Sequence, residues 1–294
     1  MKNKKKILLY LVLAVGAFIM VFPFVWMILS ALKHSAEVSS IPPTFLPADP
    51  TFENFRYALE KAPFLTYFCN SVLVTIACVA CTQFTTILAA FAFSRLKFPG
   101  RDLLFSLLLS LMMIPFEMLI ITNYQTIVGW NLVDHLLALI VPFTSSVFYT
   151  YILRNFFLSI PDSLYYSARV DGASNWKYLW RIMVPLAKPS LVTIGLLNAI
   201  NCWNSFLWTV LVTNSTETRT LPFGLYTFMT SSGIRYERLM AAATIVVIPM
   251  IILFIFFRNI KCHYYLFYFF NLSFIICVIF LQNISHYFIT ISTG

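Results

Sequence analysis

The feature that most constrains this chain is a series of apolar runs, each long enough to cross a lipid bilayer. A spanning helix needs about 20 apolar residues. The six runs cover residues 7–32, 70–94, 103–121, 136–157, 191–213 and 239–257. A backbone inside a bilayer must satisfy its own hydrogen bonds, and runs of this length do so as helices. The sequence therefore predicts an all-α, polytopic membrane bundle of six transmembrane helices.

Four prolines lie inside these runs: Pro23, Pro115, Pro142 and Pro249. Proline removes a backbone donor and leaves the carbonyl four residues earlier without its partner. Membrane bundles tolerate this loss where neighbouring helices satisfy the freed carbonyl. We therefore expect these runs to remain crossings.

The composition excludes a water-soluble enzyme. Only 11% of the residues are charged and 60% are hydrophobic, whereas a soluble domain carries about a quarter charged residues. The net charge of +9 is compatible with nucleic-acid binding, but Lys and Arg occur in short clusters between apolar runs. That distribution is typical of the charges that orient membrane helices. We therefore expect a lipid bilayer around the chain and no nucleic-acid partner.

The same charges predict the topology. Lys2, Lys4, Lys5 and Lys6 precede the first run and place the N-terminus in the cytoplasm. That run is too long for the short apolar core of a cleaved signal peptide. With six crossings, 14 of the 20 Lys and Arg residues fall on the inner side. The asymmetry agrees with the positive-inside rule.

No catalytic or metal-binding set is evident. Cys78 and Cys81 form a C-x-x-C pattern inside a predicted crossing, without His or acidic neighbours. Packing explains such cysteines better than metal or redox chemistry. Paired carboxylates, metal-ligand spacing and a phosphate-binding glycine loop are also missing from the sequence. We expect no catalytic residue and no metal, and a membrane enzyme ranks below a transporter.

The inner segment 159–189 is too long for a turn and is predicted to contain two short helices. Ser159 can cap the first helix, and Pro161 fits its first turn. Gly172 then ends this helix, because glycine readily adopts the left-handed conformation beyond a helix C-terminus. The segment therefore has a glycine corner between its helices.

Ser174 or Asn175 caps the second helix, which we expect to span 176–183 and to end before Pro185. The apolar side chains expected to form a contact surface are Leu164, Ala168, Val170, Trp176, Leu179 and Trp180. An apolar surface of this kind needs cover. On composition alone, a partner protein and the headgroups of the inner leaflet explain it equally well.

The motifs of this segment resemble the EAA loop of ABC importer permeases. The sequence Ala-Arg-Val-Asp-Gly-Ala-Ser at 168–174 precedes Ile-Met-Val-Pro-Leu-Ala-Lys-Pro at 182–189, and Gly172 and Pro185 keep the family's spacing. The likeness is strongest to carbohydrate-type permeases of the maltose class and spans about 1–257. Weaker similarities lie at Asn70-Ser71, at 113–117, at 204–208 and at 220–225.

The resemblance implies the membrane subunit of an ATP-driven, binding-protein-dependent sugar importer in a bacterial cell membrane. Its partners would be a second homologous permease, two ATP-binding cassette subunits, an extracytoplasmic solute-binding protein and a carbohydrate. The partner subunits hydrolyse ATP, and this chain binds no cofactor. Segment 159–189 would be the coupling loop to the ATPase, with site residues Tyr166, Ser167, Ala168, Asp171, Gly172, Ala173 and Pro185.

Two features depart from the family. Tyr166-Ser167-Ala168 aligns with the family's Glu-Ala-Ala, so the acidic residue is absent. After a permease domain at 1–260, the tail 261–294 is hydrophobic and, beyond Lys261, uncharged. It is read either as a seventh crossing at 264–281, which moves the C-terminus outside, or, by preference, as the product of a frameshift.

A solute path would use polar groups within the crossings, where they are costly. Glu117 is the one carboxylate deep in a run, and Asn201, Trp203 and Asn204 offer amides and an aromatic face that suit a sugar. Packing against a partner permease explains these residues equally well. The alternative function is a self-sufficient secondary transporter or channel, which usually has several charged or broken-helix sites in the membrane.

Overall fold

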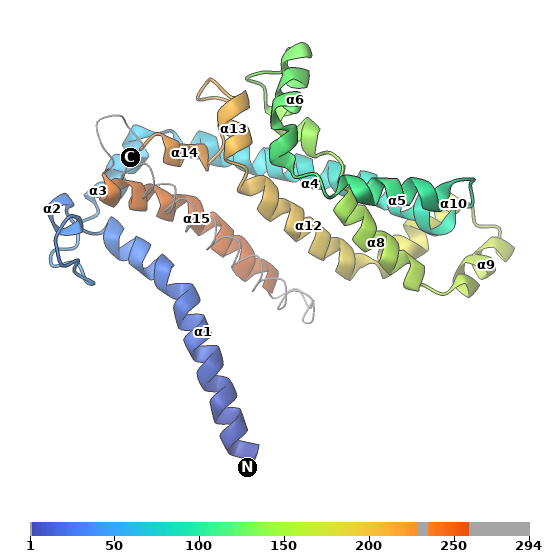
Figure 1. Ribbon diagram of the computed structural model, residues 1–294, viewed down its shortest axis with the longest axis horizontal. Coiled ribbons are helices and arrows are strands. Elements are labelled where there is room, and N and C mark those ends of the chain that lie inside the picture. Colours follow the sequence, from blue (N-terminus) through green and yellow to red (C-terminus); the bar gives the residue numbers. More distant parts are fainter. Residues whose placement is uncertain (1, 229–234, 259–294) are drawn as a thin grey trace. The chain divides into compact units, whose positions relative to one another are not determined.

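The computed structural model describes residues 2–228 and 235–258, and within these ranges every regular element is helical. The chain divides into two compact units, one formed by 1–62 with 225–294 and the other by 63–224. Figure 1 shows their elements coloured along the sequence. The tail 261–294, with both of its interpretations, lies outside the described residues.

The first unit contains α1 (Lys2–Ala31), α2 (Ser35–Val38), α3 (Glu53–Lys61) and α15 (Tyr236–Arg258). Helix α15 packs against both α1 and α3. The C-terminal carbonyls of α1 are satisfied from α3, because the buried Asn54 amide donates to Ala31 O at 2.9 Å and to Lys33 O at 2.8 Å. A helix end without such partners would leave buried carbonyls unpaired.

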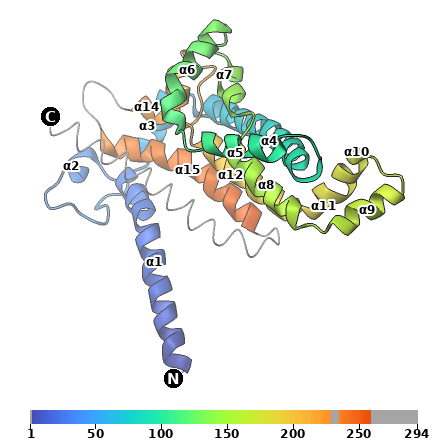
Figure 2. The same ribbon diagram turned by 45° about the vertical axis from the view of Figure 1, so that its right-hand side comes forward.

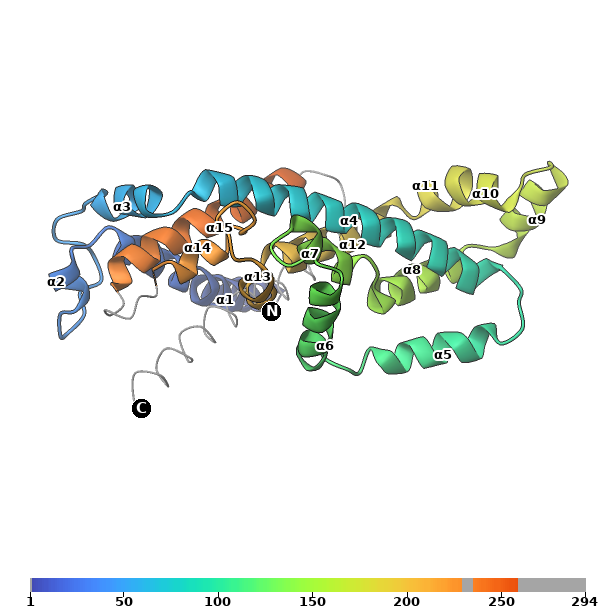
Figure 3. The same ribbon diagram turned by 90° about the horizontal axis from the view of Figure 1, so that it is seen from above.

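The second unit holds the remaining elements. They are α4 (Phe64–Arg95), α5 (Arg101–Leu111), α6 (Phe116–Gly129), α7 (Leu136–Ile140), η1 (Val141–Phe143), α8 (Val147–Ser159), α9 (Asp162–Val170), α10 (Asn175–Tyr178), η2 (Leu179–Met183), α11 (Val184–Leu186), α12 (Lys188–Trp203), α13 (Leu207–Val212) and α14 (Phe223–Tyr226), which straddles the boundary between units. Helix α4 is the central element, and α8 and α12 lie along it (Figure 3).

Pro142 shows how this unit keeps a broken helix in an apolar setting. Its missing N–H frees the carbonyl of Ala138, and the Trp208 indole donates to that oxygen at 2.9 Å. Trp208 is buried in a cluster with Cys78 and Leu139, which accounts for Cys78 by packing. The expectation that neighbouring helices satisfy the carbonyl freed by proline is confirmed here.

The predicted crossing at 103–121 is wrong as one straight helix. Helices α5 and α6 meet at 97° across a break, and Figure 3 shows α6 turning away from α5. Pro115 causes the break, because it has no N–H to donate and disfavours helical backbone in the residue before it. An 11-residue helix spans about 16 Å, roughly half of the hydrocarbon core.

Within the described residues, Leu13–Ala31 of α1 and Phe64–Arg95 of α4 are long and apolar enough to cross a membrane. Up to five crossings result if each bent pair of helices counts as one. The run predicted at 136–157 is such a pair, with a bend of 45° between Leu136–Phe143 and Val147–Ser159. The total of six stays a prediction.

Candidate functional site

The 159–189 loop is built around a glycine corner, as predicted. Gly172 has φ +75°, the left-handed conformation that favours glycine. Its N–H donates to Arg169 O at 3.1 Å, and the N–H of Ala173 donates to Ala168 O at 2.8 Å. These two bonds form a Schellman motif, which satisfies the last carbonyls of α9. The direction in which the chain leaves α9 is therefore set by backbone hydrogen bonds.

The start of the loop differs from the prediction. Ser159 is the last residue of α8 and donates its hydroxyl to Phe156 O at 2.7 Å. It therefore does not cap α9, which begins at Asp162 directly after Pro161. The expectation that Ser159 caps the first helix is wrong, because the preceding helix already uses that hydroxyl.

The second half of the loop is longer than predicted. Ser174 caps it, since its Oγ accepts from the Lys177 N–H at 3.2 Å. The helix does not end before Pro185 but continues through a π-helical turn, η2, into α11. The π turn is wider than an α turn, and it lies where the ring of Pro185 would clash with the carbonyl four residues earlier. The chain then bends by 78° into α12.

Arg95, at the end of α4, holds the base of the loop. Its guanidinium donates to Phe157 O at 2.7 Å and to Ile160 O at 2.6 Å, and it pairs with Asp162. The Arg95 side chain is 5% exposed, whereas that of Asp162 is 73% exposed. The two carbonyl contacts therefore lie in the drier surroundings, where charge-assisted hydrogen bonds are strong. Arg95 was not predicted as a site residue, although it is the first charge after the second apolar run.

Aromatic contacts brace the two halves of the loop. The Tyr165 hydroxyl donates to Asn175 Oδ1 at 3.0 Å, and its ring meets that of Tyr178 edge-on at 5.0 Å. Trp180 stacks on Phe84 of α4 with ring centroids 6.4 Å apart. Burial raises the pKa of the Tyr178 hydroxyl and keeps it neutral. The loop is consequently tied both to itself and to the longest helix of its unit.

The outward surface of the loop is narrower than expected. Leu164, Tyr166 and Trp176 are exposed, and Val170 at the end of α9 is 87% exposed. Ala168 and Leu179 were predicted to lie on this surface, but both are buried. Of the other predicted site residues, Ala173 is buried, and Ser167, Asp171, Gly172 and Pro185 are exposed. Figure 2 shows α9, α10 and α11 together at one end of the second unit.

The predicted solute-path residues fall in two places. Glu117 is exposed in the first turn of α6, where a carboxylate is favoured by the helix dipole. Asn201 is exposed on α12, and its amide donates to the Tyr149 hydroxyl of α8 at 2.9 Å. Among the described contacts, none joins Glu117 to Asn201. Tyr149 was not identified from the sequence, because its partner lies on another helix.

The other two predicted solute-path residues, Trp203 and Asn204, lie at the C-terminal end of α12. Trp203 is 5% exposed and meets the ring of Phe68 edge-on, with centroids 6.0 Å apart. Asn204 follows as the C-terminal cap residue, and its N–H donates to Ile200 O at 3.1 Å. In this conformation α4 covers the Trp203 ring, and Asn201 is the more accessible of these polar groups.

At the opposite end of the second unit, two motifs that are far apart in sequence meet. The Asn70 amide donates to Glu217 O at 2.6 Å and to Arg219 O at 3.0 Å. The neighbouring Ser71 hydroxyl accepts from the Leu221 N–H at 2.7 Å. These contacts hold the 214–224 loop against the start of α4. They explain why an Asn-Ser pair stands where the second apolar run begins.

Asp134 attaches the same loop to the turn after α6. One carboxylate oxygen accepts from the N–H groups of Asn214 at 2.8 Å and Ser215 at 2.9 Å, and from the Thr218 hydroxyl at 2.5 Å. The Ser215 N–H and the Thr218 hydroxyl contribute most to holding the pKa of Asp134 well below its usual range. This contact was not predicted from the sequence, because 80 residues separate Asp134 from Asn214.

The bent apolar helices, the polar groups on α8 and α12 and the braced loop at one end define a multi-helix membrane permease. Residues 84–261 match the family model described as binding-protein-dependent transport system inner membrane component. The chain belongs to this family, whose members are transport permeases and not enzymes.

Relatives of known function cover almost the whole chain. It is 35% identical over 266 residues to the arabinooligosaccharides transport system permease protein AraQ of Halalkalibacterium halodurans, covering 88% of this chain and 95% of that protein. It is 32% identical over 256 residues to the diacetylchitobiose uptake system permease protein DasC of Streptomyces coelicolor, covering 84% and 91%. The chain is thus a sugar-type ABC transporter permease by family.

A solved structure shows the same fold. A chain from the crystal structure of a bacterial ABC transporter involved in the import of the acidic polysaccharide alginate superposes with a TM-score of 0.74. The match covers 87% of this chain and 96% of that chain at 24% identity. At this identity the likeness establishes the fold alone.

Proposed function

We propose that this chain is the membrane-spanning subunit of an ATP-driven, binding-protein-dependent sugar importer. It lines the translocation path together with a second permease, and it couples to two ATP-binding cassette subunits through the 159–189 loop. The observation that carries this proposal is the construction of that loop. Its two helices are joined by a hydrogen-bonded glycine corner and fixed to α4, and they present apolar side chains outward.

Rigidity is what such a loop needs to transmit force. A push on the exposed end of α9 reaches Arg95 through the loop's own hydrogen bonds and aromatic contacts, so little of the displacement is absorbed within the loop. Arg95 belongs to the same helix as Asn70, which holds the 214–224 loop at the other end of the unit. Helix α4 therefore links the ATPase side to the opposite side.

The solute we propose is a carbohydrate. The two relatives are named for the transport of arabinooligosaccharides and diacetylchitobiose. Amides, hydroxyls and aromatic faces suit a sugar, and the exposed Asn201 amide beside Tyr149 is the best-placed group of this kind. Glu117, Trp203 and Asn204 remain further candidates for the path, with Trp203 requiring a conformation in which α4 uncovers it.

The proposed topology places the N-terminus and the 159–189 loop in the cytoplasm of a bacterium, with the ATPase subunits beneath the loop. ATP binds to those subunits and not to this chain. The 214–224 loop then lies on the outer side, where a solute-binding protein delivers the sugar. The absence of the family's acidic residue at Tyr166 leaves docking to the apolar side chains of α9 and α10.

The first test is purification of the tagged chain in mild detergent, with identification of stoichiometric partners by mass spectrometry. Recovery of a second permease and an ATPase supports the proposal. A folded chain recovered alone that transports solute without ATP would instead support the self-sufficient transporter or channel.

Gly172→Trp gives a sharper test. A Cβ at this position has nothing within 4 Å, and the left-handed backbone costs an ordinary residue about 1–2 kcal/mol. We expect ATP-dependent uptake to be lost while membrane insertion persists. Gly172→Asn is the matched control, because Asn tolerates left-handed backbone, and it should keep most uptake. Normal uptake by Gly172→Trp would contradict a role of the corner in coupling.

A further inference from the structure

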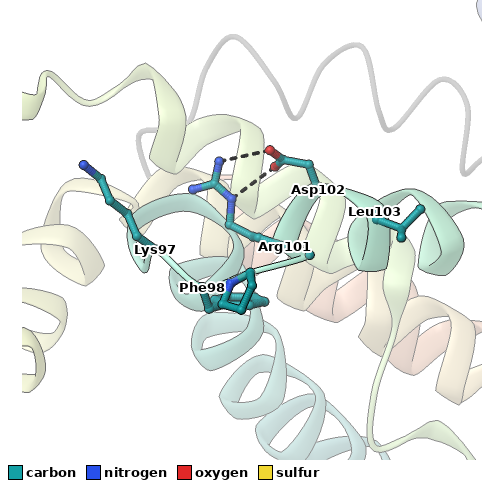
Figure 4. A pocket seen from close by; sticks show the side chains of 7 residues that line it. Lys97, Phe98, Arg101, Asp102 and Leu103 are labelled. Carbon is teal, nitrogen blue, oxygen red and sulfur yellow. Dashed lines mark hydrogen bonds and ion pairs between the residues drawn. The ribbon is translucent and has the colours of Figure 1, made fainter.

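The turn between α4 and α5 forms a shallow pocket that is open to the surroundings, named here the 97–103 cavity, whose residues none of the functions above uses. The cavity measures about 620 Å³ and is lined by Lys97, Phe98, Pro99, Gly100, Arg101, Asp102 and Leu103 (Figure 4). It begins two residues after Arg95, which holds the base of the 159–189 loop. The cavity therefore lies at the same end of the second unit as that loop, and its lining is partly polar and partly apolar.

Positive charge exceeds negative charge at this cavity. Asp102 Oδ1 accepts a hydrogen bond from Arg101 Nε at 3.1 Å and lies 3.6 Å from Arg154 Nη2. Figure 4 shows the Arg101 and Asp102 side chains joined and Lys97 pointing away from them. Within the described part of the chain, Lys97 makes no hydrogen bond or ion pair. Arg101 and Arg154 thus share one carboxylate, and Lys97 is a further cation that is available to an anion.

The cavity opens onto an apolar helix face. Helix α5 starts at Arg101 and buries Phe105 against its own unit. Its exposed large apolar side chains, from the cavity to the other end of the helix, are Leu103, Leu104, Leu107 and Leu111. With a length of about 16 Å, the helix matches one leaflet of a bilayer. A cationic cavity that continues into an apolar strip of one leaflet fits an amphiphile with an anionic head.

We propose that the 97–103 cavity binds the phosphate of an anionic phospholipid, whose acyl chains lie along α5. Lys97 and Arg101 contact the phosphate, as basic residues at the cytoplasmic membrane surface do. This proposal rests on the proposed function in one respect: the proposed topology places the cavity on the cytoplasmic side of the membrane. The lipid therefore belongs to the inner leaflet. The lipid braces the corner from which Arg95 holds the 159–189 loop.

A protein partner fits this cavity less well. The exposed leucines run from the cavity along the helix toward Pro115, which places them inside the predicted crossing and not beyond it. An ATPase in the cytoplasm reaches the turn but not this strip. Inorganic phosphate carries the same anionic group as a phospholipid headgroup but has no acyl chains. The experiment therefore distinguishes binding of a phospholipid from binding of free phosphate.

The test measures lipid retention by the purified full chain in mild detergent. The chain is mixed with phosphatidylglycerol or phosphatidylcholine, and bound lipid is counted by native mass spectrometry. We expect phosphatidylglycerol to be retained over phosphatidylcholine, and Lys97→Gln with Arg101→Gln to lower its apparent affinity about tenfold, the effect of losing charge-assisted contacts to a phosphate. Lys97→Gln alone should give part of this loss without breaking any contact within the described chain.

The matched control is Arg56→Gln with Lys61→Gln on α3, which removes the same charge elsewhere and should leave retention unchanged.

Asp102→Asn should have the opposite effect: removing the internal carboxylate should strengthen phosphatidylglycerol binding, whereas damage to the fold would weaken it. Equal retention of both lipids, or an equal loss in the control, overturns the proposal. Displacement of the lipid by inorganic phosphate at matched concentration would reassign the cavity to free phosphate. None of these measurements needs the ATPase, so failure here is distinct from failure of the proposed function.

Discussion

Single carboxylates and amides hold the ends of this unit together. Asp134 accepts four hydrogen bonds at one oxygen from residues 214, 215 and 218. Because these donors favour the ionised form, the pKa of Asp134 is lower in the folded chain than in the unfolded one. A depressed folded pKa contributes stability above the unfolded value, and this stability is lost as pH falls toward the folded value.

We therefore predict that Asp134→Asn lowers the thermal unfolding midpoint of the chain at pH 7. The difference from the unchanged chain should shrink as pH falls below about 4, the ordinary pKa of Asp. Below that value the carboxyl of the unfolded chain takes up a proton, whereas the native carboxyl, with its lower pKa, stays ionised, so the stability gained from its ionisation declines. Thermal melts in detergent at several pH values measure this. A difference that is constant across pH would show that the ionised form of Asp134 contributes nothing.

At this scale, local chemistry was predicted better than distant contacts, although not without error. The left-handed backbone of Gly172 follows from glycine's position after an amphipathic helix, and Ser174 is one of the two caps predicted for the second helix, whereas the cap predicted at Ser159 was wrong. The partners of Asp134 lie 80 or more residues away, and no sequence period indicates them. Asn70 and Ser71 were noticed as a motif, but their contacts with the 214–224 loop became visible only in the fold.

At the scale of the element, the important question is what replaces a lost backbone hydrogen bond. Pro142 frees the Ala138 carbonyl, and Trp208 on a different helix satisfies it. At Pro115 the helix breaks instead, by 97°. Both prolines stand in similar apolar runs, so the outcome depends on a neighbouring donor that the sequence does not place. The apolar runs were therefore predictable, whereas their bends were not.

The base of the 159–189 loop gives a prediction about a whole element. Arg95→Gln should remove the guanidinium from Phe157 O and Ile160 O. Phe157 O keeps the Ile160 N–H at 3.3 Å, so the part-buried Ile160 carbonyl is the one that loses its donor, at a cost of about 1–3 kcal/mol. We expect a lower unfolding midpoint and a loss of ATP-dependent uptake larger than the loss of folded protein. Uptake per folded molecule, measured in vesicles, is the readout.

Asp162→Asn is the control for this element. It removes the same ion pair from its exposed side, where such pairs contribute less than about 1 kcal/mol, and it leaves both carbonyl contacts intact. Uptake close to that of the unchanged chain is expected. If both variants lost uptake equally, the ion pair and not the carbonyl contacts would hold the loop.

At the scale of the molecule, the surface indicates that the chain works in an assembly. Many large apolar side chains are exposed on α1, α5 and α6, and lipid or a second permease can cover them. The exposed apolar residues of the 159–189 loop differ, because the predicted topology places them in the cytoplasm, where no lipid tail reaches. A protein surface is the cover that fits Val170 and Trp176.

Val170→Asp tests whether a protein covers the exposed apolar residues of the 159–189 loop. Val170 is 87% exposed, so the substitution leaves the isolated chain folded, yet a charge at the centre of an apolar contact costs binding. We expect at least about a tenfold loss of ATPase subunit per permease after purification, the effect typical of a central interface residue. Leu46→Asp, at a residue 66% exposed in the segment between α2 and α3, adds the same charge outside the loop and should leave the ratio unchanged. An unchanged ratio for Val170→Asp would show that the ATPase contacts this permease through another surface.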